Sequence, residues 1–417
     1  MKACEVEKEA GTVATESPVA PVEIQVSLLT GGFDRPYAFG LSMALISKGM
    51  CLDVIGSTEV DSPEMHTTPR LNFLNLQGNP REQAGRVRRI RKVLIFYARL
   101  FRYAAAANAK IFHILWNNKI HLFDRTLLMF YYKLLGKKIV FTAHNVNAGR
   151  RDANDSWLNR LTLRIQYQTA DHIFVHTEKM KSELLEDFGV GNEAVTIIPF
   201  GINNSVPDTE LTPSRARQRL GIESKAKTIL FFGAIRQYKG LEHLVGAFQR
   251  IAPTDENYRL VIAGEVKKGA EEYFRNIQNT IEGDPCRKQV IQKIEFVPDD
   301  ETEVYFKAAD VLVLPYSEIF QSGVLFLAYS FGLPVIAADV GSFRDDILPG
   351  KTGFLCRSCS AVDLANTLET YFASDLYKTL SMQRPEIRDY AMGRNSWSVV
   401  ADKTSKVYLD LLGKRSS

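Results

Sequence analysis

The chain has 417 residues, of which 45% are hydrophobic and 24% charged, and its formal net charge is +4. A chain of this length is long enough for two domains, and its ordinary composition excludes disordered and fibrous proteins. The small net charge gives no reason by itself to expect a nucleic-acid partner.

The first 20 residues carry charges of both signs and have no apolar core, so we expect a mobile tail and not a signal peptide. No apolar run in the sequence reaches the roughly 18 residues that a transmembrane helix needs. The five cysteines are few and odd in number, which favours a reducing compartment over a disulfide framework. We therefore expect a cytoplasmic protein.

From residue 21 onward, short apolar runs alternate with amphipathic stretches, a pattern typical of βαβ units and parallel sheets. In the first half we predict strands at 24–29, 52–55, 73–76, 111–115, 138–142, 172–176 and 195–198. The apolar run 124–135 is too long for a strand and predicts a buried helix. Residues 199–213 are rich in Pro, Asn, Asp and Thr, which predicts a linker.

A second α/β series follows the linker. Its predicted strands lie at 228–232, 259–263, 294–297, 311–314 and 334–337, and the apolar period of residues 396–412 predicts a helix. We therefore expect two doubly wound, Rossmann-like domains, residues 21–205 and 206–390, and a C-terminal helical stretch, residues 391–417, that packs back toward the first domain. The strands of two such domains point their carboxyl ends at a shared cleft, where helix N-termini bind phosphate.

The first motif lies at the end of the first predicted strand. Gly31 and Gly32 let the backbone approach a ligand closely, although a tight strand–helix turn explains them equally well. Asp34 follows them and is a candidate catalytic base on the acceptor side. Asp152 and Asp155 are weaker candidates of the same kind. For all three, a cap or turn residue is the alternative.

The other two motifs lie in the second half. A strand ends at Gly233, and Arg236 and Lys239 follow, two cations that can neutralise a departing diphosphate. Further along, a glycine-bearing turn opens an apolar helix, where the N–H groups of Ser322–Val324 (Ser322, Gly323, Val324) are a natural seat for a phosphate. Solvated surface cations and the packing of an ordinary βαβ unit are the respective alternatives.

Residues 81–110 combine cations with apolar and aromatic side chains. The cations central to this pattern are Arg88, Arg89, Arg91 and Lys92. A basic amphipathic helix of this kind can lie on anionic lipid, so we expect peripheral association with the inner face of the cell membrane. A helix packed on its sheet with a solvated cationic face is one alternative. RNA binding is another, but no RNA-binding motif accompanies the helix, and we expect no nucleic-acid partner.

Taken in order and with their spacing, several of these motifs resemble family 4 glycosyltransferases. The residues that carry the resemblance are Gly31-Gly32, Ala143-His144-Asn145, 199–202, Gly233, Lys239-Gly240, Ala263-Gly264-Glu265, Ala309-Asp310-Val311, Ser322–Val324, 331–337 and 351–355. The resemblance implies a GT-B fold, in which two doubly wound Rossmann-like domains face a central cleft that holds a nucleotide-sugar donor.

The resemblance also implies roles for single residues. Lys239 matches the phosphate-binding lysine of the family, and Arg236 stands in for an arginine whose usual place is taken by Ala234. His144 matches a histidine that reaches the donor sugar and is our catalytic candidate beside Asp34. Gly32 and Gly264 are expected to line the donor site.

One part of the family pattern is missing. Two glutamates, eight residues apart, should fall near Ile319 and Leu327, and neither position is acidic. Glu318 lies next to the first position and is expected to contact the donor. The family implies transfer with retention of configuration, but the missing pair leaves the donor and the stereochemical outcome open.

The sequence therefore predicts an enzyme that transfers a sugar from a nucleotide-sugar donor to a glycan or lipid-linked acceptor. The expected context is bacterial cell-surface or exopolysaccharide synthesis. The alternatives are a catalytically silent GT-B scaffold that binds nucleotide-sugar or glycan, and a GT-B epimerase or phosphorylase. We expect no metal and no cofactor, because Arg236 and Lys239 can supply the charge that a divalent ion supplies elsewhere. A single C-x-x-C, Cys356 and Cys359, has no partner pair that would make a metal site.

Overall fold

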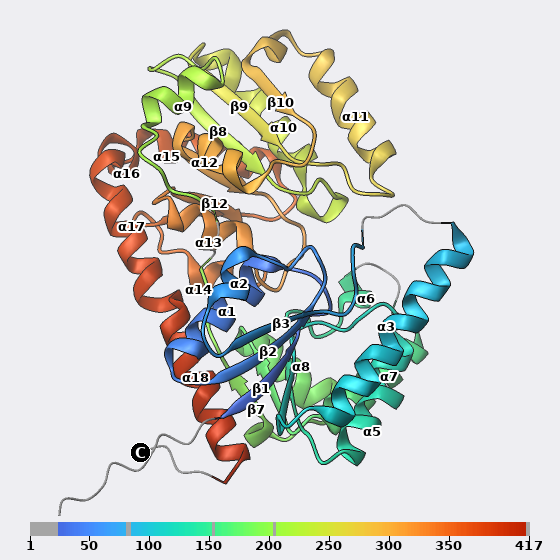
Figure 1. The fold of residues 1–417 in the computed structure, drawn as a ribbon. Helices are drawn as coiled ribbons and strands as arrows, with labels where there is room; N and C mark the ends of the chain where they lie inside the picture. Colours follow the sequence, from blue (N-terminus) through green and yellow to red (C-terminus); the bar gives the residue numbers. More distant parts are fainter. Residues whose placement is uncertain (1–23, 81–84, 152–154, 203–205, 414–417) are drawn as a thin grey trace, which may run out of the picture.

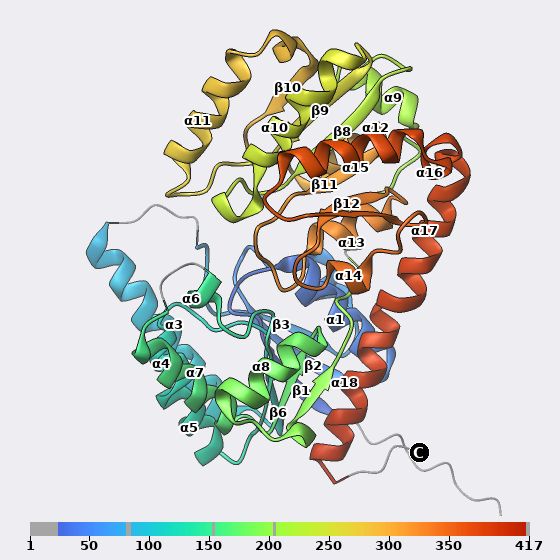
Figure 2. The ribbon, with the colours of Figure 1, turned by 180° about the vertical axis from the view of Figure 1, so that it is seen from behind.

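The computed structural model describes residues 24–80, 85–151, 155–202 and 206–413. Within these residues the chain forms two α/β domains, each built on a fully parallel sheet (Figures 1 and 2). The strand order is β3-β2-β1-β4-β5-β6-β7 in the first sheet and β10-β9-β8-β11-β12-β13 in the second. The order reverses between β1 and β4 and between β8 and β11, which is where doubly wound sheets bind ligands. The predicted fold class is confirmed.

The strands of the first domain are β1 (Gln25–Leu29), β2 (Cys51–Gly56), β3 (Leu71–Asn75), β4 (Ile111–Ile114), β5 (Lys138–Thr142), β6 (His172–Val175) and β7 (Val195–Ile197). The inner strands are mostly buried, as parallel strands covered on both faces must be, whereas the edge strands β3 and β7 are partly exposed. The helices are α1 (Arg35–Ser47), α2 (Pro63–Thr67), α3 (Arg86–Ala106), α4 (His121–Arg125), α5 (Leu127–Leu134), α6 (Ala148–Arg151), α7 (Trp157–Thr169) and α8 (Glu178–Phe188).

The second domain repeats this plan after the linker. Its strands are β8 (Lys227–Phe232), β9 (Tyr258–Ala263), β10 (Val290–Lys293), β11 (Val311–Leu314), β12 (Val335–Ala338) and β13 (Gly353–Cys356). Its helices are α9 (Pro213–Arg219), α10 (Leu241–Ile251), α11 (Glu271–Glu282), α12 (Asp299–Ala308), α13 (Gly323–Ser330), α14 (Phe343–Asp346), α15 (Ala361–Ala373) and α16 (Asp375–Lys378). The long helices α17 (Leu380–Asn395) and α18 (Trp397–Leu411) end the described chain.

Three sequence-based assignments are wrong. The strand predicted at 294–297 is a loop, in which Phe296 is 55% exposed. The edge strand is β10, which lies just before this run and is less apolar than it, so the apolar pattern points to the wrong residues. The other edge strand, β13, is missing from the strands that the sequence predicts. The helix predicted over 124–135 is split at Thr126 into α4 and α5, and it is only partly buried, since Leu127 and Leu134 are 63% and 86% exposed.

The last helix lies on the first domain. Helix α17 runs along the second domain, and α18 continues past the linker to pack against α1, as both views show (Figures 1 and 2). Trp397 enters the core there, and a Cβ added to Gly40 of α1 would lie 2.1 Å from its indole, so a glycine is required at this crossing. Tyr408 Oη lies 2.6 Å from His113 Nδ1 on β4.

Candidate functional site

A buried cation lies at the inner end of the second sheet. Gly233 directly follows β8, and the short 3₁₀ helix η2 (Gln237–Lys239) brings Lys239 back beside it. A Cβ built on Gly233 would lie 3.3 Å from Lys239 Nζ and 3.6 Å from Val324 Cγ2. The second and third motifs of the sequence therefore meet at one place.

Lys239 has no counter-ion in the part of the chain that the structure describes. Its side chain is buried, with Nζ 5.2 Å from the ring centre of Tyr316. Burial lowers the pKa of Lys239, and the nearby charge of Arg236 adds to that effect. Arg236 itself is exposed. A desolvated ammonium without a partner is unfavourable in a core, and such groups mark sites where an anion binds.

The start of α13 completes this site. Ser322 is the N-cap residue and is buried, and Gly323 and Val324 form the first turn. Their N–H groups have no acceptor within the helix, as in the first turn of any helix. With Lys239 Nζ on one side and these N–H groups on the other, the arrangement offers an anion both a charge and directed donors.

Gly264 lies next to this site for a different reason. A Cβ on Gly264 would lie 1.9 Å from the carbonyl oxygen of Gly233, so the ends of β8 and β9 approach each other as only a glycine permits. Packing therefore explains this glycine, and its contact with a donor stays a prediction.

His144 follows β5 in the first domain and is held by aromatic neighbours. Its ring stacks on Trp116, with the centroids 4.2 Å apart and an angle of 6° between the planes. Its Nδ1 lies 3.1 Å from His176 Nε2, while its buried Nε2 has no hydrogen-bond partner among the described residues. Burial holds the pKa of His144 well below its ordinary value, so the ring is neutral and Nε2 is available to a ligand group.

One linker side chain connects His144 with the second domain. The ring of Phe200 lies 6.2 Å from that of His144 and stacks on Phe326 of α13 at 5.7 Å. A Cβ on Gly323 would lie 3.5 Å from the same phenyl ring. His144 and the α13 turn are thus separated by a single side chain. The sequence analysis assigned no role to Phe200 or to Trp116, although both follow predicted strands.

The first motif surrounds a turn that is already occupied by structural contacts. Gly32 adopts a φ of +82° between β1 and α1 and packs against Gln77. Asp34 is the N-cap residue of α1, and its Oδ1 accepts the N–H of Tyr37 at 3.3 Å. Its side chain reaches solvent, yet the surrounding protein desolvates the carboxyl group and raises its pKa. The cap explains Asp34, and its catalytic role stays a prediction.

Glu318 faces the first domain across a cavity of about 190 Å³. It is exposed, and the opposite wall is formed by Asn147, Arg150, Lys179 and Glu183. The two positions where the family pattern has glutamates, Ile319 and Leu327, are buried in the core of the second domain. An acidic side chain at Leu327 would be buried among apolar groups, which accounts for the leucine in structural terms.

The predicted membrane residues lie away from this site, on α3. Arg88, Arg89 and Arg91 are exposed and Lys92 is half-buried; we call these four the α3 cations. Between them lie Val87, Ile90 and Leu94, which are 81%, 56% and 64% exposed. No helix of the described residues is both long enough and apolar enough to cross a bilayer.

The remaining candidates lie apart from the site. Asp155 stabilises a loop before α7, and Asp152 lies outside the described residues. Burial raises the pKa of the Cys356 thiol to about 12, whereas Cys359 is exposed, and both are free. Among the described residues, no three His, Cys, Asp or Glu side chains are grouped as metal ligands would be.

Two family models match successive halves of the chain. The model described as Glycosyltransferase Family 4 matches residues 37–206, and the one described as Glycosyl transferases group 1 matches residues 214–387. The chain belongs to the family 4 glycosyltransferases.

Individual relatives are more distant. A D-inositol 3-phosphate glycosyltransferase of Corynebacterium aurimucosum is 27% identical over 287 residues, which are 66% of this chain and 66% of that protein. The chain thus spans slightly less than two thirds of that relative's length. The sucrose-phosphate synthase of Thermosynechococcus elongatus is similar in structure, with a TM-score of 0.75 and 19% identity over 94% of this chain and 100% of that one. Anabaena HepE in complex with UDP and glucose gives a TM-score of 0.73 and 15% identity, over 93% and 100% of the two chains. These likenesses establish the GT-B fold.

Proposed function

We propose that this protein is a glycosyltransferase that binds a nucleotide-sugar between its two domains and transfers the sugar to an acceptor. The observation that carries the proposal is Lys239, a buried ammonium beside the first turn of α13 for which the described part of the chain offers no counter-ion. A diphosphate leaving group gains charge as its bond to the sugar breaks, and a preorganised cation with directed N–H groups stabilises that charge. Arg236 adds a second cation, so the proposal needs no metal and no cofactor.

The first domain supplies the opposite wall of the donor site. His144 Nε2 is buried and has no partner among the described residues, and a hydroxyl group of the donor sugar would give it one. We propose that Glu318 contacts the same sugar from the second domain. The solved complex of Anabaena HepE with UDP and glucose supports a uridine nucleotide as the first donor to test.

For the acceptor, we propose a glycan or lipid-linked molecule at the inner face of the membrane, as in bacterial cell-surface or exopolysaccharide synthesis. The support is the mixed surface of α3. Exposed apolar side chains recur there at helical spacing among the α3 cations, and about 1 kcal/mol per cation near an anionic leaflet gives reversible binding. Helix α5 lies beside α3, with the Tyr131 hydroxyl donating to the Phe101 carbonyl at 3.1 Å, and it adds exposed Leu127, Phe130 and Leu134.

The test is a panel of nucleotide-sugars incubated with the purified chain and a membrane extract. Release of free nucleotide that depends on the extract is the expected result. Binding of UDP without any turnover across the panel would instead favour the silent scaffold. If the chain neither binds nor turns over any member of the panel, the proposal is wrong.

A further inference from the structure

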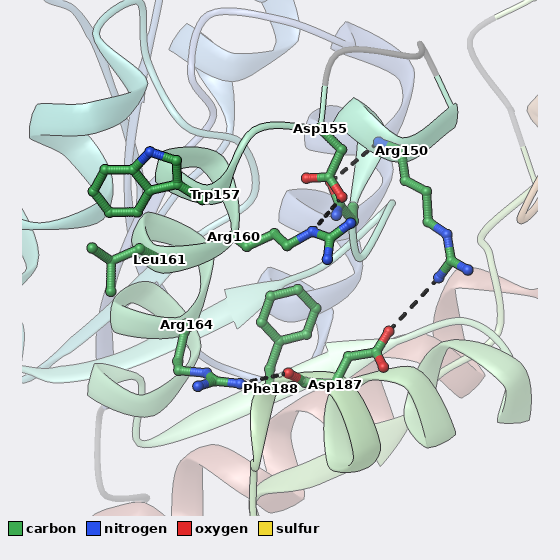
Figure 3. Close-up of a pocket in the computed structure, with 9 residues that line it drawn as sticks. Arg150, Asp155, Trp157, Arg160, Leu161, Arg164, Asp187 and Phe188 are labelled. Carbon is green, nitrogen blue, oxygen red and sulfur yellow. Dashed lines mark hydrogen bonds and ion pairs between the residues drawn. The ribbon is translucent and has the colours of Figure 1, made fainter.

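A second pocket, larger than the cleft cavity, lies in the first domain between α6, α7 and α8 (Figure 3). Its volume is about 540 Å³, which is within the range of roughly 300–1,000 Å³ typical of small-molecule sites. Three arginines, Arg150, Arg160 and Arg164, direct their guanidinium groups around the ring of Phe188, and Trp157 forms a further wall. We call this the arginine pocket.

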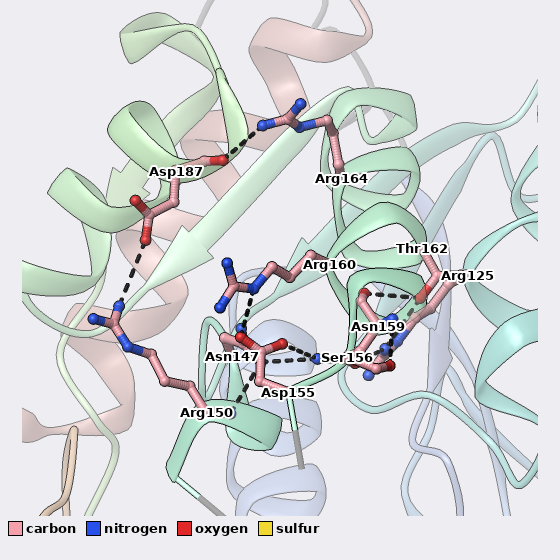
Figure 4. A network of polar contacts seen from close by, with 10 residues as sticks. All are labelled: Arg125, Asn147, Arg150, Asp155, Ser156, Asn159, Arg160, Thr162, Arg164 and Asp187. Atoms are coloured by element: carbon pink, nitrogen blue, oxygen red, sulfur yellow. Dashed lines mark hydrogen bonds and ion pairs between the residues drawn. The ribbon is translucent and has the colours of Figure 1, made fainter. Parts of the chain in front are cut away.

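A chain of hydrogen bonds fixes one of these arginines (Figure 4). Arg125 Nη1 donates to Asn159 Oδ1 at 2.8 Å, and Asn159 Nδ2 donates to Asp155 Oδ1 at 3.0 Å. Asp155 Oδ2 then accepts from Arg160 Nε at 2.7 Å. Burial would raise the pKa of Asp155, but the bonds from Asn159, Asn147 and Arg160 outweigh it and lower that pKa, so the carboxylate stays charged. Arg160 is therefore oriented before any ligand arrives.

The other two arginines are less fully neutralised. Arg150 Nη1 lies 3.8 Å from Asp187 Oδ2, a loose contact between exposed groups that contributes little. Arg164 donates to the backbone carbonyl of Asp187 at 3.0 Å and has no carboxylate partner among the described residues. The described lining thus holds three cations and two carboxylates. Guanidinium groups arranged around one space match the geometry of a phosphate, which accepts paired N–H bonds.

The arginine pocket adjoins the cavity that Glu318 faces. Asn147 and Arg150 line both the arginine pocket and the cavity that Glu318 faces. A molecule whose anionic end occupies the arginines can therefore extend past Asn147 toward the place proposed for the donor sugar. Trp157, which also lines the pocket, has an exposed indole that points away from the guanidinium groups (Figure 3).

We propose that the arginine pocket binds a phosphate group carried by the acceptor and so holds the acceptor's reactive hydroxyl toward the cleft. This inference rests on the proposed function, because only a transferase needs an acceptor. The phosphate belongs either to a soluble phosphate ester or to the headgroup of a membrane lipid.

The first measurement is the binding of inorganic phosphate to the full chain, followed by phosphorus NMR. It is made in a Lys239→Met background, which removes the cation of the donor site. Arg164→Gln, which leaves the Asp155 network intact, should weaken binding about tenfold, as the loss of one charge-assisted contact does. The triple variant Arg150→Gln, Arg160→Gln and Arg164→Gln should abolish saturable binding.

A matched control removes the same charge from the second domain. Three exposed arginines that form no ion pair with any described residue are replaced there, as Arg215→Gln, Arg219→Gln and Arg275→Gln. Phosphate affinity should not change in this control. If it falls as much as in the pocket variants, the binding is general electrostatics and the proposal is overturned, and the same follows if the pocket variants bind phosphate as well as the parent.

Two further arms separate the sources of the phosphate and the two proposals. Loss of binding to phosphatidylglycerol vesicles in the pocket variants, with the α3 cations intact, assigns the site to a lipid headgroup, whereas retained vesicle binding assigns it to a soluble ester. UDP affinity, measured in Arg164→Gln with Lys239 restored, should be unchanged, because Arg164 lines the arginine pocket and not the cavity that Glu318 faces. If the unaltered chain binds no member of the nucleotide-sugar panel, the proposed function fails while the phosphate measurement still decides the character of the pocket.

Discussion

Two buried lysines of the second domain should respond in opposite ways when their charge is removed. Lys239 has no counter-ion among the described residues, whereas Lys307 lies 2.8 Å from Asp208 and 2.9 Å from Glu303. Both are below 10% exposed. Methionine keeps most of the length and volume of lysine, so Lys239→Met and Lys307→Met change charge while disturbing packing little.

The expected changes follow from these surroundings. Lys239→Met removes a charge whose desolvation is not offset, so the free energy of unfolding should stay the same or rise. Lys307→Met leaves Glu303 buried without its cation, and loss of one partner of a buried pair costs about 3–5 kcal/mol. The effects on catalytic turnover should be reversed between the two variants. Turnover should fall on the order of a hundredfold to a thousandfold in Lys239→Met, as on removal of a preorganised contact to the developing charge, and stay close to normal in Lys307→Met.

Urea denaturation and steady-state kinetics on the two variants make the comparison. If Lys239→Met is stable and inactive while Lys307→Met is unstable and active, Lys239 belongs to the donor site. If Lys239→Met loses as much stability as Lys307→Met, or keeps normal turnover, the reasoning is refuted.

Four other expectations can be checked with similar means. His144→Ala should reduce turnover more than His172→Ala; the reverse order, in the same assay, would place the cleft elsewhere. Burial lowers the pKa of His176 from 6.5 to about 4, so below pH 6.5 the unfolded chain binds more protons than the folded one. The free energy of unfolding should therefore fall by up to about 3 kcal/mol as the pH drops from 6.5 to 4. Thermal melts of His176→Asn should lose this part of the pH dependence. Asp34→Asn keeps a side chain that can cap α1, so melting should not change, and a hundredfold loss of turnover would identify the carboxylate as a base, whereas normal turnover leaves only a cap. Changing the α3 cations to glutamine should abolish co-sedimentation with anionic vesicles at low salt, and equal binding by both proteins would make α3 a packing helix.

How far the sequence predicts the fold depends on burial. Strands in the middle of a sheet are covered on both faces and read as continuous apolar runs, so β5 and β11 are predicted to the residue. Edge strands lose that signal because one side of their ladder is open. β10 is only partly buried, and the sequence predicts a strand at the neighbouring apolar run 294–297 instead, whereas β13 is missing from the predicted strands.

The site was predictable where one short stretch of sequence carries its chemistry. Lys239 and the Ser322–Val324 turn lie in the connections that follow β8 and β11, and the parallel topology brings the ends of those strands together. The arginine pocket had no such signal. Arg150, Arg160 and Arg164 lie on separate turns of α6 and α7, and their convergence depends on how those helices pack against α8. Nor could the sequence show that His144 Nε2 has no partner, since that depends on the ring orientation set by Trp116.

The chain passes between the domains twice, and the two crossings are tied to each other. The N–H of Ile202 donates to the carbonyl of Asn395 at 3.0 Å, and Trp397 Nε1 donates to the carbonyl of Ile202 at 2.7 Å. Because these two hydrogen bonds join the crossing segments, we expect them to bend as one unit and to resist twisting of one domain against the other. Trp397 anchors the second strand in the first domain. Shortening the chain before Trp397 would therefore free the hinge and uncover α1 in a single step.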